Sequence, residues 1–184
     1  MSKEKYDVIV VGGGHAGVEA ALISSFLGVS VALITMDKNA IARMSCNPAI
    51  GGLAKGQIVR EIDVLGGLMA ETADVSGLQF KTLNKSKGRA VWSPRAQIDK
   101  RVYERNVLKK IENSRISIIQ SEATSVDIRN YKVKSILLRS GEKIKCSCLI
   151  ITAGTFLSGL IHIGERKILA GYSAVVKFVE KLIL

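Results

Sequence analysis

One short motif near the start of the chain restricts the fold more than any other feature. A β-branched apolar run, Asp7–Val11, leads into glycines, and His15–Leu27 follows with apolar residues at near-helical spacing. The glycines match G-x-G-x-x-G, a pattern that lets a backbone turn approach a pyrophosphate at the positive end of a helix. The sequence therefore predicts an α/β fold with a parallel sheet and a dinucleotide site made by Gly12, Gly13, Gly14, His15, Ala16 and Gly17.

A second predicted strand, Ser30–Thr35, completes a βαβ unit. In dinucleotide sites of this kind, an acidic residue about 20 residues after the glycines commonly binds the adenosine ribose. Thr35 occupies the usual place, and Asp37 lies two residues later. Either Thr35 supplies a weaker hydrogen bond or Asp37 bends back, and the sequence leaves both open.

The order of the later elements distinguishes between dinucleotides. We expect a loop with short helical turns over 39–56, a helix over 57–70, a polar basic segment over 81–94, an amphipathic helix over 96–113 and a strand over 116–120. Three short strands follow at 124–129, 133–139 and 142–146, and a last strand at 149–152. Such a meander before the final strand is typical of FAD-binding domains of the glutathione reductase type. By that analogy the backbone of Thr124 meets the adenine, and Thr152 to Gly154 close beneath the cofactor.

Positive charge is concentrated in the middle of the chain. Residues 81–148 hold 17 basic and 6 acidic side chains, a net charge of +11. The whole chain has the same net charge, so the remaining residues sum to zero. A concentrated basic segment favours phosphate-rich partners such as nucleic acid, but a solvated basic face is the alternative. The same choice applies to Trp92, which either stacks on a base among neighbouring lysines and arginines or packs against the protein.

The three cysteines favour a reducing, cytoplasmic setting over a disulfide framework. No Cys/His spacing fits a zinc site, so we expect no metal. Cys146 and Cys148 are two apart on a predicted strand and are expected in the core. The nearly uncharged run at 8–36 contains Glu19 and several glycines, and the uncharged run at 148–164 contains glycines and polar residues, so neither is expected to span a membrane.

Several longer motifs are more specific than the glycine turn. They are Met44-Ser-Cys-Asn-Pro-Ala-Ile-Gly-Gly-Leu-Ala-Lys-Gly56, Glu61-Ile-Asp-Val-Leu-Gly-Gly67, Lys87-Gly-Arg-Ala-Val-Trp92 and Gly154-Thr-Phe-Leu-Ser-Gly159. Together with the glycine turn they closely resemble the amino-terminal part of the MnmG family, also called GidA, over about residues 6–164. The resemblance implies an FAD-dependent enzyme that modifies the wobble uridine of certain transfer RNAs.

The same resemblance implies partners and site residues. The family works as a homodimer with the GTPase MnmE and installs a carboxymethylaminomethyl group at carbon 5 of uridine 34. It uses methylenetetrahydrofolate, glycine and NADH. The family's Ser-Cys-Asn-Pro thiol falls on Cys46, a candidate catalytic or redox residue whose alternative role is that of a small buried side chain. Ser173 is matched to a flavin-contacting serine.

Members of this family run to several hundred residues. We therefore expect residues 1–164 to be the amino-terminal segment of an FAD-binding domain that is incomplete at its C-terminus, and 165–184 to be a divergent or truncated tail. A noncatalytic fragment that at most binds FAD or RNA is one alternative function. A generic NAD(P)H-dependent flavin oxidoreductase is another, and it leaves the motif at 44–56 unexplained.

Overall fold

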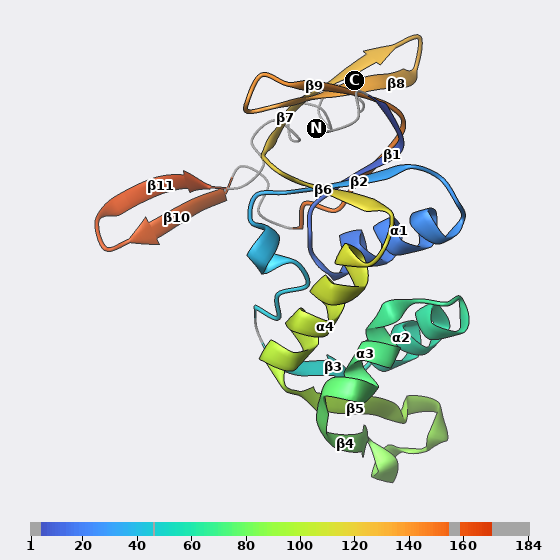
Figure 1. The fold of residues 1–184 in the computed structure, drawn as a ribbon. Helices are drawn as coiled ribbons and strands as arrows, with labels where there is room; N and C mark the ends of the chain where they lie inside the picture. Colours follow the sequence, from blue (N-terminus) through green and yellow to red (C-terminus); the bar gives the residue numbers. More distant parts are fainter. Residues whose placement is uncertain (1–4, 46, 155–158, 171–184) are drawn as a thin grey trace. The chain divides into compact units, whose positions relative to one another are not determined.

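The computed structural model describes residues 5–45, 47–154 and 159–170 (Figure 1). The chain divides into two compact units. The first combines Met1–Ala40 with Arg115–Leu184, and the second is Ile41–Ser114. The glycine turn and the meander therefore belong to the first unit, whereas the motif at 44–56 and the polar basic segment belong to the second.

The first unit is built on one six-stranded sheet with the order β6-β2-β1-β9-β8-β7. Its first four strands pair in parallel, and the last two extend it antiparallel. All five residues of β2 are buried, as expected for a strand in the middle of a parallel sheet. The bounds are β1 Lys5–Val11, β2 Val31–Thr35, β6 Ile116–Gln120, β7 Ala123–Arg129, β8 Lys132–Leu138 and β9 Lys143–Ile151.

The core of this unit joins the parallel strands to the meander. Side chains of Ile9, Val11 and Ile34 form one buried cluster with Ile136 and Ile144. Helix α1, His15–Phe26, contacts β1, β2, β6 and β9. The meander therefore contributes core residues to the same unit that carries the glycine turn.

The predicted break between the third meander strand and the final strand is wrong. Strand β9 runs without interruption, pairing antiparallel with β8 through Lys143–Lys145 and parallel with β1 from Lys145 to Ile151. The intervening Ser147 and Cys148 include no turn-forming glycine, proline or asparagine, so nothing local ends the strand. One strand thus connects the meander directly to the half of the sheet that carries the glycine turn.

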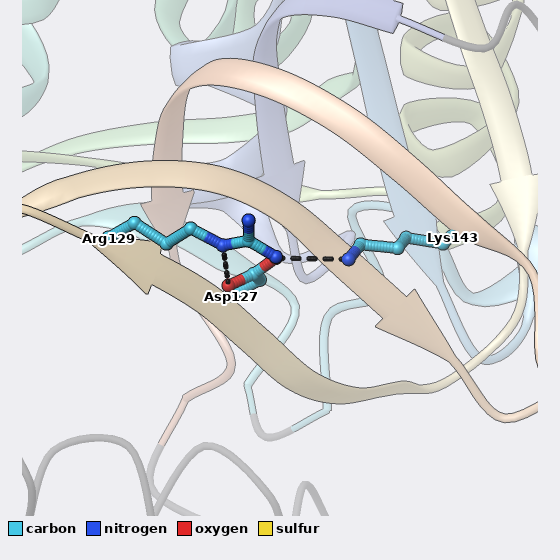
Figure 2. A network of polar contacts seen from close by, with 3 residues as sticks. All are labelled: Asp127, Arg129 and Lys143. Carbon is cyan, nitrogen blue, oxygen red and sulfur yellow. Dashed lines mark hydrogen bonds and ion pairs between the residues drawn. The ribbon is translucent and has the colours of Figure 1, made fainter.

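An exposed ion-pair network connects two strands of the meander (Figure 2). The Asp127 carboxylate accepts from Lys143 Nζ at 3.0 Å and from Arg129 Nη2 at 3.3 Å. These two cations hold the pKa of Asp127 below its ordinary value. Because water screens exposed pairs, the network contributes little to stability, and its one carboxylate offsets only one of the two positive charges.

The second unit packs three helices with a small antiparallel sheet of order β3-β5-β4. Its buried residues include Ile50 and Ile98 from the sheet and Tyr103, Val107 and Ile111 from α4. The bounds are β3 Ala49–Gly51, α2 Lys55–Val64, α3 Leu68–Ser76, β4 Gly77–Leu83, β5 Ser93–Ile98 and α4 Lys100–Glu112.

Three predictions for this unit need correction. The helix predicted over 57–70 is two helices, because Gly66 has a φ of 87° and breaks the chain between α2 and α3. The segment 39–56 contains β3 as well as turns. The helix predicted from residue 96 begins only at Lys100, because 93–98 form β5 and the Asp99 carboxylate caps α4 by accepting from the N–H groups of Arg101 and Val102.

A hairpin of β10, Gly159–Ile163, and β11, Arg166–Ala170, was not predicted.

No helix in the described part of the chain is both long and apolar enough to cross a bilayer.

The two cysteines of β9 differ in environment. Cys146 is buried in the core as expected, whereas Cys148 is exposed, so the prediction of a core position is wrong for Cys148. Burial raises the pKa of the Cys146 thiol to about 11, and the neighbouring Cys148 adds to this shift.

We predict that iodoacetamide at pH 8 modifies Cys148 and spares Cys146. A thiol of pKa about 11 is ionised in only about one molecule in a thousand at pH 8, and the thiolate is the reacting form. Peptide mapping by mass spectrometry distinguishes the sites, and the urea-unfolded chain, in which both should react, is the control. Equal labelling of both cysteines in the folded chain would contradict the buried position of Cys146.

Candidate functional site

Two glycines of the predicted turn are required by close packing. Gly12 ends β1 with a φ of 112°, and a Cβ there would lie 2.4 Å from the carbonyl oxygen of Thr152. A Cβ on Gly17, in the first turn of α1, would lie 1.9 Å from the Gly12 carbonyl oxygen. Neither position accepts a side chain without movement of the backbone, so these glycines let α1 approach β1 and β9 closely.

Gly14 has a different role. It precedes α1 as the N-cap with φ −71° and ψ 179°, a conformation open to any residue, and a Cβ there would meet no atom within 4 Å. Nothing in the described part of the chain therefore requires glycine at this position. A side chain would enter only the space outside the turn, at a helix N-terminus, where an anionic group is stabilised. The turn at 12–17 thus forms an open cradle of the kind that the predicted pyrophosphate site requires, and the site itself stays a prediction.

Thr152 clamps this turn from β9. Its N–H donates to the Val11 carbonyl oxygen at 2.8 Å. Its hydroxyl lies 3.0 Å from that oxygen and 3.1 Å from the carbonyl oxygen of Gly12, so it also donates to the end of β1. On the other side, the Gly12 N–H donates to Ile34 of β2 at 2.9 Å. The ends of three parallel strands together fix the position of the turn.

At the end of β2, Thr35 and Asp37, the two candidate ligands of the ribose, make different contacts. Thr35 is buried, and its hydroxyl donates to the backbone oxygen of Asp37 at 3.1 Å. Asp37 is half-buried at the surface, and its carboxylate accepts from the N–H of Asn39 at 2.9 Å. The Thr35 hydroxyl therefore serves the protein's own backbone, whereas the Asp37 carboxylate lies in the turn that follows β2.

Thr124 lies at an irregularity in the meander. The pairing of β7 with β8 shifts between Ala123 and Ser125, so Thr124 is the extra residue of a bulge. Its hydroxyl donates to the Leu137 carbonyl oxygen at 3.0 Å. A bulge interrupts the regular ladder of backbone hydrogen bonds, which agrees with a backbone contact to a ligand at this position.

Two predicted site residues, Cys46 and Ser173, lie outside the described residues. The chain on both sides of Cys46 is tied to the second unit. The Met44 N–H donates to the Glu104 carboxylate at 3.0 Å, and the Pro48 carbonyl oxygen accepts from the Ile98 N–H at 2.7 Å. These bonds anchor the motif at 44–56 to α4 and β5.

Close packing against β5 explains the glycines of the motif at 44–56. A Cβ on Gly51 would lie 2.3 Å from the Pro94 carbonyl oxygen, and a Cβ on Gly56 would lie 2.7 Å from the same oxygen. The Gly52 N–H donates to it at 2.8 Å. The glycine-rich stretch therefore lets α2 pack closely against β5. The sequence did not reveal this contact, because it joins residues about 40 positions apart.

The predicted basic segment contains a compact turn, residues 84–92, which we call the basic turn. The Trp92 indole N–H donates to the Lys85 carbonyl oxygen at 3.2 Å, and the Arg89 guanidinium lies 5.8 Å from the ring centroid. The tryptophan is 40% exposed. It is therefore held by the turn but not packed into the core.

A cavity of about 620 Å³ lies in the same unit. Residues from α2, α3, β4 and β5 line it, and so does Lys85 of the basic turn. Its lining is mixed in charge, with the cationic residues Arg60, Lys81, Lys85 and Arg95, the carboxylates of Asp63 and Asp74, and the ring of Phe80.

Comparison with known proteins decides the family. A family model described as glucose inhibited division protein A matches residues 7–181, nearly the whole chain. The chain belongs to the GidA family. The resemblance found in the motifs is thereby confirmed.

Individual relatives agree with this membership. The protein from Sulfurihydrogenibium sp. (strain YO3AOP1), named tRNA uridine 5-carboxymethylaminomethyl modification enzyme MnmG, is 50% identical over 170 residues, or 91% of this chain and 27% of that protein. The protein of the same name from Chlorobium phaeobacteroides (strain DSM 266 / SMG 266 / 2430) is 54% identical over 160 residues, or 86% of this chain and 26% of that one.

A solved structure supports the fold. The structure of Aquifex aeolicus GidA in its form II crystal matches with a TM-score of 0.89 and 42% identity, covering 97% of this chain and 31% of that one. The predicted α/β class, an FAD/NAD(P)-binding Rossmann-like domain with a meander, is confirmed. The GidA-family chain spans about a quarter to a third of the proteins that it matches.

We predict that Gly17→Ala and Gly14→Ala differ sharply in their effect on folding. The first forces a methyl group against backbone and should lower the free energy of unfolding by about 2 kcal/mol or more. The second adds a methyl group in open space at an N-cap and should cost less than about 1 kcal/mol. Urea denaturation followed by circular dichroism measures both, and equal losses would show that the packing at Gly17 is not tight.

Proposed function

We propose that this chain is the amino-terminal part of an FAD-dependent enzyme that modifies the wobble uridine of transfer RNA by adding a carboxymethylaminomethyl group at carbon 5. The observation that carries the proposal is the cradle at Gly14, in a chain whose family match covers residues 7–181. The names of the curated relatives support the reaction. In this proposal residues 1–164 form the first segment of the FAD-binding domain, and 165–184 form its tail.

The chain's own residues supply the binding of FAD in this proposal. The N–H groups of the turn at Gly12–Gly17 bind the pyrophosphate, and Thr152 keeps that turn in place. The Asp37 carboxylate, rather than the inward-bonded Thr35 hydroxyl, binds the ribose. The Thr124 backbone meets the adenine, and Ser173 contacts the flavin. When bound, FAD supplies the redox chemistry of the reaction.

Cys46 is proposed as the thiol of the reaction, acting as a nucleophile or redox partner. The residues on both sides of it, Met44 and Pro48, bond to α4 and β5, which supports a place for this motif in the second unit. NADH, methylenetetrahydrofolate and glycine are proposed as cosubstrates of the whole enzyme. MnmE and a second copy of the protein are its proposed partners, in the cytoplasm.

We predict that Gly14→Val abolishes FAD binding while the protein stays folded. The valine side chain would occupy the space of the pyrophosphate, and the extended backbone at Gly14 accepts it. Equilibrium dialysis with FAD measures binding, and the thermal transition of the same sample reports folding. If the folded variant binds FAD as tightly as the unchanged chain, the turn does not hold the cofactor.

We predict that Cys46→Ser, made in a complete protein that carries this amino-terminal sequence, folds and holds FAD but loses most wobble-uridine modification. Serine keeps nearly the size of cysteine and removes the sulfur chemistry. The assay contains MnmE, GTP, NADH, glycine and methylenetetrahydrofolate, and the modified nucleoside is quantified by mass spectrometry. Modification near the unchanged level would return Cys46 to a packing role.

A further inference from the structure

The basic turn holds its tryptophan in a fixed position near the surface. The indole N–H of Trp92 donates to Lys85, and its backbone N–H donates to the Arg89 carbonyl oxygen at 3.2 Å. Its own carbonyl oxygen accepts from the Gln57 amide at 3.3 Å. The Asn84 amide donates to Val91 at 3.4 Å and closes the turn. A side chain that is 40% exposed is thus oriented before any ligand arrives.

Arg89 adds a cation to this aromatic surface. Its guanidinium is 5.8 Å from the Trp92 ring centroid, within the range of a cation–π contact. A guanidinium is planar and itself stacks on aromatic rings and bases. The pair therefore offers a flat surface that combines an indole with a positive charge.

The sequence around this surface is strongly basic, although the cavity that Lys85 lines also holds Asp63 and Asp74. No acidic residue occurs between Asp74 and Asp99, whereas five basic residues do. In the described part of the chain, the ion pairs involve basic residues elsewhere, such as Lys110 with Glu71 and Arg139 with Glu122. The cations of this stretch that form no ion pair with any described residue are Lys81, Lys85, Lys87, Arg89 and Arg95.

We propose that Trp92 and Arg89 form a stacking platform for an unpaired base of single-stranded RNA, with Lys85 and Lys87 binding the adjacent phosphates. The proposal rests on the proposed function, which makes an RNA the substrate. An oriented aromatic among unpaired cations fits a single strand, because a base must leave its helix before it can stack on a protein side chain. Lys85 also lines the cavity of about 620 Å³, together with the cationic side chains of Arg60, Lys81 and Arg95.

Trp92 reports on this contact directly, because it is the only tryptophan in the chain. The 184-residue protein is titrated with a labelled RNA hairpin containing a seven-nucleotide loop, and with a fully paired RNA duplex of equal length. Stacking should quench the tryptophan emission as the hairpin binds and do so much less with the duplex. Tryptophan emission that stays unchanged while the label shows full binding of the hairpin would overturn the proposal.

Matched variants separate stacking from charge. Trp92→Ala should weaken hairpin binding about tenfold or more, and Trp92→Phe should retain most of it, because both aromatic rings can stack. Lys85→Glu combined with Lys87→Glu should weaken binding and flatten its dependence on salt. The control is Tyr131→Ala, which removes an exposed aromatic residue from the turn after β7, near Arg129 and Lys132, and should change nothing. Circular dichroism verifies that each variant is folded.

The outcomes distinguish this proposal from the proposed function. Hairpin binding by folded Trp92→Ala within twofold of the unchanged chain refutes the platform but leaves RNA as a substrate. A chain that binds FAD and no RNA refutes the platform without touching the flavin site. Binding of polyglutamate with the same dependence on Trp92 would show an acidic peptide in place of RNA, and would also overturn the proposal.

Discussion

The close approach of Gly12, Gly17 and Thr152 is the contact on which the first unit depends. Two positions without side chains let α1 meet the ends of β1 and β9, and the Thr152 hydroxyl fills the remaining gap by bonding to two carbonyl oxygens. This contact directs the N-terminus of α1 to the edge where three parallel strands end. A site for an anionic group follows from the packing itself, because that edge is where the backbone N–H groups of the turn are available.

Local patterns predicted the first unit better than the second. The β-branched strands and the glycine turn were correct because their signals come from adjacent residues. Strands β4 and β5 were missed because β4 is largely exposed and polar, and such a strand is hard to distinguish from a loop. The single strand β9 was divided in two because its continuity comes from pairing with β1 and β8, which no short window of sequence contains.

The candidate site shows the same limit. The glycine pattern at 12–17 was recognisable because its members are neighbours in the sequence. The clamp by Thr152 was not, because its partner Gly12 lies 140 positions away in the chain. The contacts of Thr35 and Asp37 also needed coordinates, because both side chains bond to nearby backbone groups. Sequence can therefore identify a turn before it identifies the residues that support it.

Like charges in the basic turn destabilise the free chain, but the same charges attract an anionic partner. Three cations within five residues repel one another, and none of them forms an ion pair with a described residue. Backbone hydrogen bonds and the Arg89–Trp92 contact nevertheless hold the turn in one conformation. Solvent and salt screen much of the repulsion in the free chain. A bound polyanion removes what remains, and a partner that carries several phosphates, such as RNA, can neutralise all three cations at once.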